Sequence, residues 1–245
     1  MQILSILVLV IVTLFTTQAD AYEVWLADQS DTGKESGGYL HIYDGAQLAA
    51  DPSGAKPAVT MDLSGEVNKL CEEATKKPVR RPHMLFFTKD QSHVILSFLS
   101  GHVLFMDAAT KKPEACLSMG KNVHAAWPTP DQKMALVANM AEKKLIRIWT
   151  DYANHKFTFD ESKDVMSLGP MESPERPDNA PVCPITDNTS KHAFITLRGG
   201  GLIVADATET PMKVVATLDN KQIHPAGCGG IQVGIGTNLD SVAQQ

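Results

Sequence analysis

The chain has 245 residues, of which 22 are lysine or arginine and 28 are aspartate or glutamate, so its formal net charge at pH 7 is −6. A mildly acidic chain without long basic runs lacks the positive surface that attracts nucleic acids and anionic membranes, so neither is expected as a partner. The one basic cluster, at 76–81, falls in an expected connection between elements, where a solvated loop is the simpler interpretation.

The first 21 residues have the features of a secretory signal peptide. An apolar run covers residues 3–15, and an Ala-x-Ala site at 19–21 precedes Tyr22. The run is short for a bilayer, which takes roughly 20 apolar residues to cross. Residues 1–21 are therefore predicted to be a signal peptide, and the remainder is predicted to be secreted or periplasmic, with no membrane contact beyond this leader. Because no lysine or arginine precedes Lys34, an uncleaved N-terminal anchor stays open as the alternative.

Short apolar runs separated by polar turns recur along residues 22–236. The period is about 41 residues, which is typical of β-propeller blades. Because the runs are continuously apolar rather than alternating, each strand is expected to be covered on both faces by neighbouring blades. We predict an all-β fold, a β-propeller of four-stranded blades that is incomplete at about four to five blades.

The expected elements follow the chain in a simple order. The predicted blades span 22–64, 79–119, 120–181 and 182–219, and another begins at 220–236 before a polar tail at 237–245. The first blade lacks an inner strand, which the C-terminal end could supply by closing the ring. Apolar spacing between residues 66 and 76 predicts one short surface helix. Residues 152–181, rich in Pro, Asp, Glu and Ser, predict a long loop inside the third blade.

Each copy of the repeat opens on a potential metal ligand, namely His83, His124, Cys183 and His224. The intervals are 124 − 83 = 41, 183 − 124 = 59 and 224 − 183 = 41, and the long middle interval contains the polar insertion. The second and third copies align without a gap from their histidines to an aspartate seven residues later. Since the start of an innermost strand lies near the central channel, these side chains are expected to approach one another there.

Several strand-and-turn segments resemble the repeats of YVTN-type, YncE-like propellers. They are 42–44, 105–110 and 204–208, together with the turn 129–133. The resemblance covers most of residues 22–231. It implies an exported bacterial or archaeal propeller, related to those of nitrous-oxide reductase, methylamine dehydrogenase (its heavy chain) and thiocyanate dehydrogenase, which carry or support redox sites. The ligand sets of those enzymes are not matched here residue by residue. Residues 146–149 also resemble a WD40 strand, but no Gly-His dipeptide opens the blades.

Two interpretations of the opening residues stay open. In the first, His83, His124, Cys183 and His224, with Cys228 as a fifth candidate, converge on the channel and bind copper, zinc or iron. In the second, the histidines hydrogen-bond the backbone of a neighbouring blade and Cys183 is a small core residue. No compact metal motif such as Cys-x-x-Cys is present, so the fold has to supply any ligand geometry.

The four cysteines predict disulfides in an exported chain. A bridge between Cys71 and Cys116 is one possibility, but Cys183 and Cys228 are also 45 residues apart and three pairings are possible. Asn188 opens a glycosylation sequon, which matters in a eukaryotic source. Four further histidines at strand starts or turns are expected to be exposed and without function: His93, His102, His155 and His192.

The pattern favours an exported binding or scaffold module that holds a small molecule or a protein at the central channel. The alternative is a metal-dependent redox protein that uses the histidine and cysteine set at the axis. The sequence contains no Ser-His-Asp order, nucleophile elbow or paired-carboxylate pattern, and it leaves open whether the chain is an enzyme. Geometry separates the two hypotheses, because three ligand atoms within about 4–5 Å of one point would favour a metal.

Overall fold

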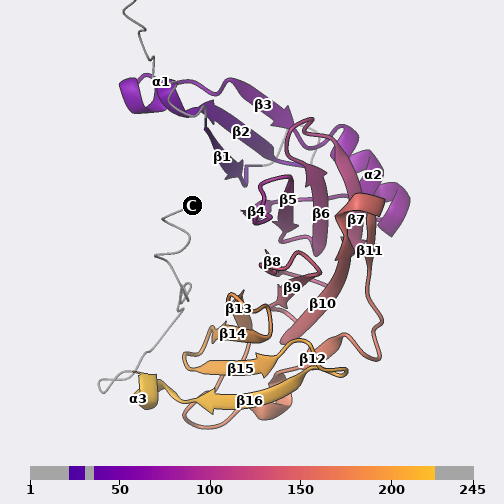
Figure 1. The fold of residues 1–245 in the computed structure, drawn as a ribbon, viewed down its shortest axis with the longest axis vertical. Coiled ribbons are helices and arrows are strands. Elements are labelled where there is room, and N and C mark those ends of the chain that lie inside the picture. Colours follow the sequence, from indigo (N-terminus) through magenta and orange to yellow (C-terminus); the bar gives the residue numbers. More distant parts are fainter. Residues whose placement is uncertain (1–21, 31–35, 224–245) are drawn as a thin grey trace, which may run out of the picture.

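A computed structural model describes residues 22–30 and 36–223, and it consists mainly of antiparallel β-sheet. The expected signal peptide, His224, Cys228, most of the expected further blade and the tail lie outside the described residues. Within the described part of the chain, four sheets follow one another in sequence order. Figure 1 shows them side by side along an arc, with the first strand of each sheet toward the inside and the last strand toward the outside.

The first sheet has three strands: β1 (Glu23–Asp28), β2 (Tyr39–Asp44) and β3 (Val59–Asp62). A short helix that the sequence did not predict, α1 (Gly45–Ala50), follows β2. Asp44 caps it, because its carboxylate accepts a hydrogen bond from the Gln47 amide at 2.8 Å. The expected helix is α2 (Glu66–Thr75). It buries Val67 and Cys71 and packs against the second sheet rather than standing on the surface alone.

The second and fourth sheets have the four strands expected of a blade. The second contains β4 (Pro82–Phe87), β5 (His93–Phe98), β6 (His102–Asp107) and β7 (Pro113–Ser118). The fourth contains β13 (Pro181–Thr186), β14 (His192–Leu197), β15 (Leu202–Asp206) and β16 (Lys213–Leu218). A short helix, α3 (Asn220–Ile223), stands where the start of another blade was expected. No helix among residues 22–30 and 36–223 has the length and apolar character needed to span a bilayer.

The third sheet corrects the prediction of a long loop at 152–181. Its strands are β8 (Val123–Pro128), β9 (Met134–Asn139), β10 (Lys144–Asp151), β11 (Lys156–Thr158) and β12 (Val165–Ser167). Two turns of 3₁₀-helix, η1 (Tyr152–Asn154) and η2 (Gly169–Met171), lie in the same segment. The short strands β11 and β12 both pair with β10, at its two ends, and so divide the outer strand of this blade into two pieces. Strands of three residues are too short to show a period in the sequence.

Three apolar layers hold neighbouring sheets together. Leu40 and Leu63 meet Leu96 and Leu104 between the first two sheets; Phe105 meets Val137 and Ile148 between the next two; Leu136 and Leu145 meet Ile195 and Ile203 between the last two. Every residue of β5 and β9 is buried. This double-sided burial explains why their sequences are continuously apolar, and it confirms the all-β, four-stranded blade prediction.

A disulfide joins Cys71 on α2 to Cys116 on β7. It closes a sequence separation of 45 residues and fastens the helix to the outer strand of the second sheet. Of the other two cysteines, Cys183 is a buried thiol on β13, and Cys228 lies outside the described residues.

Candidate functional site

His83 and His124 lie at corresponding places on the innermost strands β4 and β8. The pairing of each strand with its neighbour slips at this point, between Pro82 and Leu85 on β4 and between Val123 and Ala125 on β8. Such bulges re-aim side chains. The two imidazoles meet edge to face, with ring centroids 4.4 Å apart and planes inclined at 74°. The structure therefore brings together the two histidines that the 41-residue interval pairs.

Hydrogen bonds fix both rings. His124 Nδ1 lies 2.9 Å from the Val182 carbonyl oxygen, a contact that places the proton on Nδ1 and leaves the lone pair on Nε2. His83 Nδ1 contacts the side-chain amide of Gln29, the residue that follows β1. The Nε2 atom of His83 is buried and has no hydrogen-bond partner among the described residues. His83 Nε2 is therefore the ring nitrogen that has no partner among the described residues.

Both imidazoles are neutral at pH 7. Burial lowers the pKa of His83, and the nearby Arg81 charge lowers it further. Burial also lowers the pKa of His124, with a further contribution from His83, to about 4. Neutral imidazole is the form that binds metals, and it is also the form that tolerates burial without a counter-ion.

The depressed pKa of His124 should make the fold sensitive to mild acid. An unfolded histidine takes up its proton near pH 6.5, whereas folded His124 does so near pH 4. Its contribution to stability is therefore complete above pH 6.5 and is lost progressively as the pH falls toward 4. Urea unfolding between neutral pH and about pH 4 should show a larger loss of midpoint for the wild type than for His124→Gln. Equal losses in the two proteins would contradict this role of His124.

Cys183 does not occupy the position of the two histidines. One backbone hydrogen bond closes the turn after each innermost strand: Thr88 N to His93 O, Thr129 N to Met134 O and Asp187 N to His192 O. Since 88 − 83 = 129 − 124 = 187 − 182 = 5, the residue equivalent to the histidines is Val182. Val182 follows His124 by 58 residues, and its carbonyl oxygen is the one that His124 Nδ1 contacts. A shift of one residue turns a strand side chain to the opposite face, and Cys183 packs in the apolar cluster with Ala125 and Ile185.

The described residues therefore supply a pair of imidazoles at the axis rather than a complete metal site. Within this part of the chain, His83, His124 and Cys183 do not provide three ligand atoms within 4.8 Å of one another. A metal held by the two histidines would need further ligands, and the remaining candidates, His224 and Cys228, lie outside the described residues.

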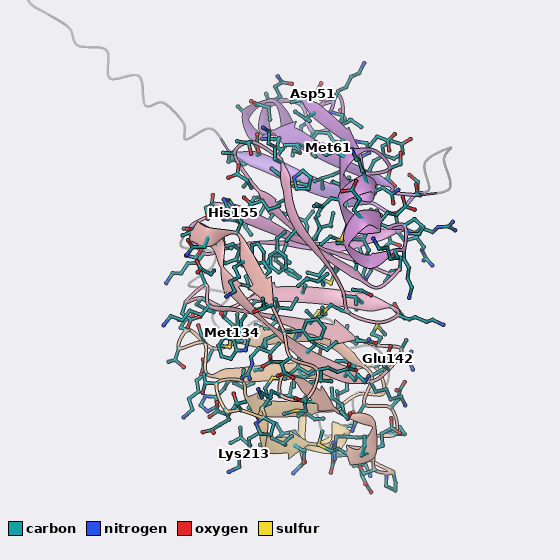
Figure 2. The ribbon with its side chains drawn as sticks, turned by 90° about the vertical axis from the view of Figure 1, so that its right-hand side faces the viewer. Asp51, Met61, Met134, Glu142, His155 and Lys213 are labelled. Carbon is teal, nitrogen blue, oxygen red and sulfur yellow. A yellow bond between two sulfur atoms is a disulfide. The ribbon has the colours of Figure 1, made fainter. Side chains whose placement is uncertain are left out.

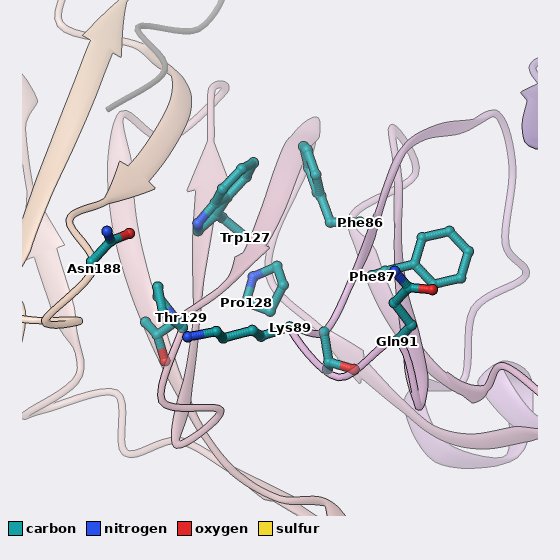
Figure 3. Close-up of a pocket in the computed structure, with 10 residues that line it drawn as sticks. Phe86, Phe87, Lys89, Gln91, Trp127, Pro128, Thr129 and Asn188 are labelled. Carbon is teal, nitrogen blue, oxygen red and sulfur yellow. The ribbon is translucent and has the colours of Figure 1, made fainter. Parts of the chain in front are cut away.

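A cavity of about 380 Å³ opens at the opposite end of the same innermost strands. Its lining comes from the ends of β4 and β8, the turns that follow them, and one residue of the turn between β13 and β14: Phe86, Phe87, Thr88, Lys89, Gln91, Trp127, Pro128, Thr129, Pro130 and Asn188. Figure 3 shows these side chains around the opening. The cavity therefore lies between neighbouring sheets, at one end of their innermost strands.

The apolar wall of the cavity is rigid. Phe86 and Trp127 occupy corresponding positions, since 86 − 83 = 127 − 124 = 3, and their rings pack edge to face with centroids 4.7 Å apart. Phe87 is held in turn by Trp25 of the first sheet, at a centroid distance of 5.3 Å. Pro128 continues the wall with a backbone whose φ is fixed. Such a wall offers aromatic faces and edges at little cost in conformational entropy.

The polar side of the cavity carries a positive charge. Lys89 is the one charged residue among those that line it. Figure 3 shows its side chain extending below Pro128 toward Thr129, with Asn188 on the far side. The hydroxyl of Thr129 already donates to Asp131 at 2.7 Å, and that of Thr88 donates to Asp90 at the same distance. The lysine ammonium, the amides of Asn188 and Gln91, and the Trp127 indole Nε1 are therefore the groups that can meet a polar ligand atom. The indole nitrogen is buried and has no hydrogen-bond partner among the described residues.

Solved structures similar to this chain identify the architecture. A putative 6-phosphogluconolactonase from Bacteroides fragilis matches with a TM-score of 0.55 and 11% identity, over 84% of this chain and 56% of that one. The periplasmic gluconolactonase of Pseudomonas aeruginosa matches with a TM-score of 0.52 and 13% identity, over 78% of this chain and 53% of that one. The chain has a β-propeller fold.

Further comparisons show that the likeness is limited to the fold. The dihydro-heme d1 dehydrogenase NirN, solved in complex with DHE, matches with a TM-score of 0.52 and 14% identity, over 80% of this chain and 34% of that one. This chain spans about half the length of the two lactonase structures. No protein-family model and no curated protein matches it. At such low identities the likeness extends to the propeller fold and not to the YncE-like family or to an activity.

Four further histidines were expected to be exposed, and the structure contradicts this for two of them, His93 and His102. His155 is exposed as expected, with its side chain 63% accessible, and His192 is partly exposed at 37%. His93 and His102 are buried, at 8% and 1% exposed. The η1 turn of the third blade covers His93, through the ring of Tyr152, and helix α2 covers His102, through a 3.0 Å contact with the Thr75 hydroxyl. A position at the start of a strand carries no information about what a neighbouring element places over it.

The aromatic side chains of the cavity were not predicted from the sequence, although the sequence contains a signal for them. The gapless alignment of 83–90 with 124–131 places Phe86 opposite Trp127, so two large aromatic side chains recur at one position of adjacent blades. Asn188, the residue of the glycosylation sequon, is exposed at the rim of the same cavity.

Proposed function

We propose that this chain is a binding module of the propeller type and that the cavity beside Phe86, Trp127 and Lys89 is its ligand site. The observation that carries the proposal is the cavity itself, a space of about 380 Å³ at the ends of the innermost strands, with an aromatic wall and few converging polar groups. Ligand sites of small molecules commonly enclose about 300–1,000 Å³ and have this composition.

The lining defines the class of ligand. The aromatic wall of Phe86 and Trp127 suits a flat apolar ring, which would bury its faces and edges against them. Lys89 suits an anionic or hydrogen-bond-accepting group on the same molecule, because its ammonium is a donor without acceptor capacity. A small aromatic anion, such as an aromatic carboxylate, combines both features.

Export of the module is part of the proposal. The Cys71–Cys116 disulfide supports it, because structural disulfides persist mainly in secreted and periplasmic proteins. The fold likeness to a gluconolactonase described as periplasmic points the same way. We propose a secreted or periplasmic location, with the propeller related to the YncE-like repeats that its strand-and-turn segments resemble.

A pair of fluorescent probes tests the ligand class. Anilinonaphthalene sulfonate carries an anion, and phenylnaphthylamine is nearly the same ring system without a charge. The wild type should bind both saturably and the anion more tightly. Lys89→Gln should weaken binding of the anion by about tenfold and leave the neutral probe unchanged, because one charge-assisted hydrogen bond is removed. Trp127→Ala should weaken both probes, because the wall is lost.

The control is Lys121→Gln, which removes an exposed lysine of the third blade outside the cavity. It should bind both probes like the wild type. Two results would count against the proposed site. The first is an anion affinity that falls equally in Lys89→Gln and Lys121→Gln. The second is binding that Trp127→Ala leaves intact in a folded protein.

The alternative function is metal-dependent redox chemistry at the axis, with copper, zinc or iron as the metal. It is favoured by one observation: two neutral imidazoles lie in contact, and the buried Nε2 atom of His83 has no hydrogen-bond partner among the described residues. Metal at this place would be lost in a His124→Gln variant, as measured by metal analysis of the purified protein.

A further inference from the structure

A second set of metal-ligating side chains lies away from the channel, in the outer half of the second blade. It consists of His93, Asp107 and Glu114, and one potential ligand atom from each lies within 4.8 Å of the other two. Among residues 22–30 and 36–223, this is the one group of three or more such side chains that meets this distance. Neither the channel histidines nor the aromatic cavity includes any of these residues.

Strand register explains why the three side chains meet. His93 at the start of β5 pairs directly with Asp107 at the end of β6. On the next strand, Phe105 pairs with Ala115 but Met106 pairs with Pro113, so Glu114 is the extra residue of a bulge. A bulge turns its extra side chain out of the regular alternation. Glu114 is thereby directed toward the His–Asp pair instead of following the face of its strand.

The carboxylate of Glu114 is buried and incompletely satisfied. Its side chain is 10% exposed, and its Oε2 atom accepts no hydrogen bond from the described residues. The nearest polar atom is His93 Nε2, at 3.3 Å. A buried carboxylate is costly unless donors or a cation face it, and this oxygen has only the His93 imidazole beside it, so a cation would satisfy it.

The hydrogen bonds of His93 indicate which of its ring nitrogens carries the proton. The Ser92 hydroxyl donates to Asp90 at 2.8 Å, so it can only accept from His93 Nδ1, which lies 2.7 Å away. The proton of a neutral His93 is therefore on Nδ1, and the lone pair of Nε2 faces the Glu114 oxygen. Two acceptors face each other across 3.3 Å, a separation close to the about 3.4 Å between neighbouring ligands of a tetrahedral zinc ion.

The third blade covers this group. His155 Nδ1 lies 3.0 Å from the other oxygen of Glu114, and the ring of Tyr152 packs on His93 with centroids 4.6 Å apart. The Tyr152 hydroxyl is itself buried without a hydrogen-bond partner in the described structure. Figure 2 shows His155 on the part of the third blade that reaches toward the second, and Figure 1 shows this part beside β7. The His155 side chain is 63% exposed, so this side of the group borders solvent.

We propose that His93 Nε2, the Asp107 carboxylate and Glu114 Oε2 bind one divalent transition-metal ion, zinc by preference. Imidazole together with carboxylates suits zinc, whereas calcium and magnesium prefer oxygen ligands alone. Two carboxylates and one neutral imidazole also balance the charge of the ion. His155 holds the second oxygen of Glu114 and acts as a positioning residue, as second-sphere partners of metal ligands do.

The fourth blade offers a natural control for this site. His192 pairs with Asp206 as His93 pairs with Asp107. The bulge residue there is Val215, since Val204 pairs with Ala216 and Ala205 with Val214. Val215 is 56% exposed and provides no ligand. The fourth blade thus carries the His–Asp pair without the third side chain.

Zinc titration of the full chain by calorimetry tests the proposal. The wild type should bind one ion saturably, and Co²⁺ in its place should give the intense visible absorption of a four-coordinate site. Glu114→Gln and His93→Gln should weaken zinc binding by about a hundredfold, because each removes a ligand. His192→Gln should bind zinc like the wild type, and His124→Gln separates this site from the channel axis. Circular dichroism confirms that each variant is folded.

Several outcomes would overturn this site. A folded wild type without saturable zinc binding would do so by itself, and would leave a protonated His93 paired with Glu114 as the role of the cluster. Equal affinity in the wild type and in folded Glu114→Gln would also do so. Loss of binding only in His124→Gln would place the metal at the channel axis instead.

Discussion

Replacing Arg147 with alanine should destabilise the chain by about 3–5 kcal/mol, the range found when one partner of a buried ion pair is removed. The Arg147 side chain is fully buried. Its Nε and Nη2 atoms both donate to Asp164 Oδ1, at 2.9 and 2.6 Å, and Nη1 donates to the carbonyl oxygens of Ala207 and Glu209 at 2.6 and 2.7 Å. One guanidinium thus ties the third blade to the fourth.

The effect is large because the partners of Arg147 stay buried when it is removed. Asp164 is 3% exposed and would keep only the donors of Trp149 and Asp160, at 3.0 and 2.8 Å. Urea unfolding at neutral pH measures the loss. Arg147→Lys should fall between the wild type and Arg147→Ala, because lysine keeps the charge but not the forked geometry.

The matched control is Lys163→Ala, which removes an exposed lysine paired with Asp160 and should leave the unfolding midpoint nearly unchanged. If Arg147→Ala were no more destabilising than this control, the buried ion pair would not be what joins the third and fourth blades.

Removing the disulfide should cost about 2–4 kcal/mol, because the bridge between Cys71 and Cys116 restricts a long loop in the unfolded chain. The double variant Cys71→Ser/Cys116→Ser should unfold at a lower urea concentration than the wild type. Both cysteines are buried, at 0% and 5% exposed, so the serine hydroxyls add to the cost.

A reductant provides the internal check on this prediction. It should lower the midpoint of the wild type toward that of the double variant and should leave the double variant unchanged. A wild-type midpoint that does not respond to reductant, in protein whose thiols are titrated before and after, would exclude a stabilising bridge at this place.

The sequence predicts the fold where the signal is local. Runs such as 94–98 and 134–138 are continuously apolar because both faces are covered, and they became β5 and β9. The insertion at 152–181 was mispredicted because its strands, β11 and β12, have three residues each. Helix α1 was missed for the same reason, since six residues give less than two full turns of helical periodicity.

The candidate sites could likewise be predicted only where the signal is local. Equal spacing on aligned strands was enough to pair His83 with His124. It failed for Cys183 because the insertion hides a shift of one residue, and only the turn hydrogen bonds reveal that Val182 is the equivalent residue. The surroundings of Glu114 depend on a bulge in β7 and on cover from the third blade, and neither leaves a mark on the sequence nearby.

The most direct test of the proposed ligand site uses the three tryptophans of the chain, each of which gives one indole N–H signal in a nitrogen–proton correlation spectrum. Trp127 lines the cavity, whereas Trp149 lies in the outer part of the third blade. During titration with anilinonaphthalene sulfonate, the Trp127 signal should move saturably and the Trp149 signal should stay in place. Saturable probe binding that leaves the Trp127 signal unmoved would contradict the assignment of this cavity as the ligand site.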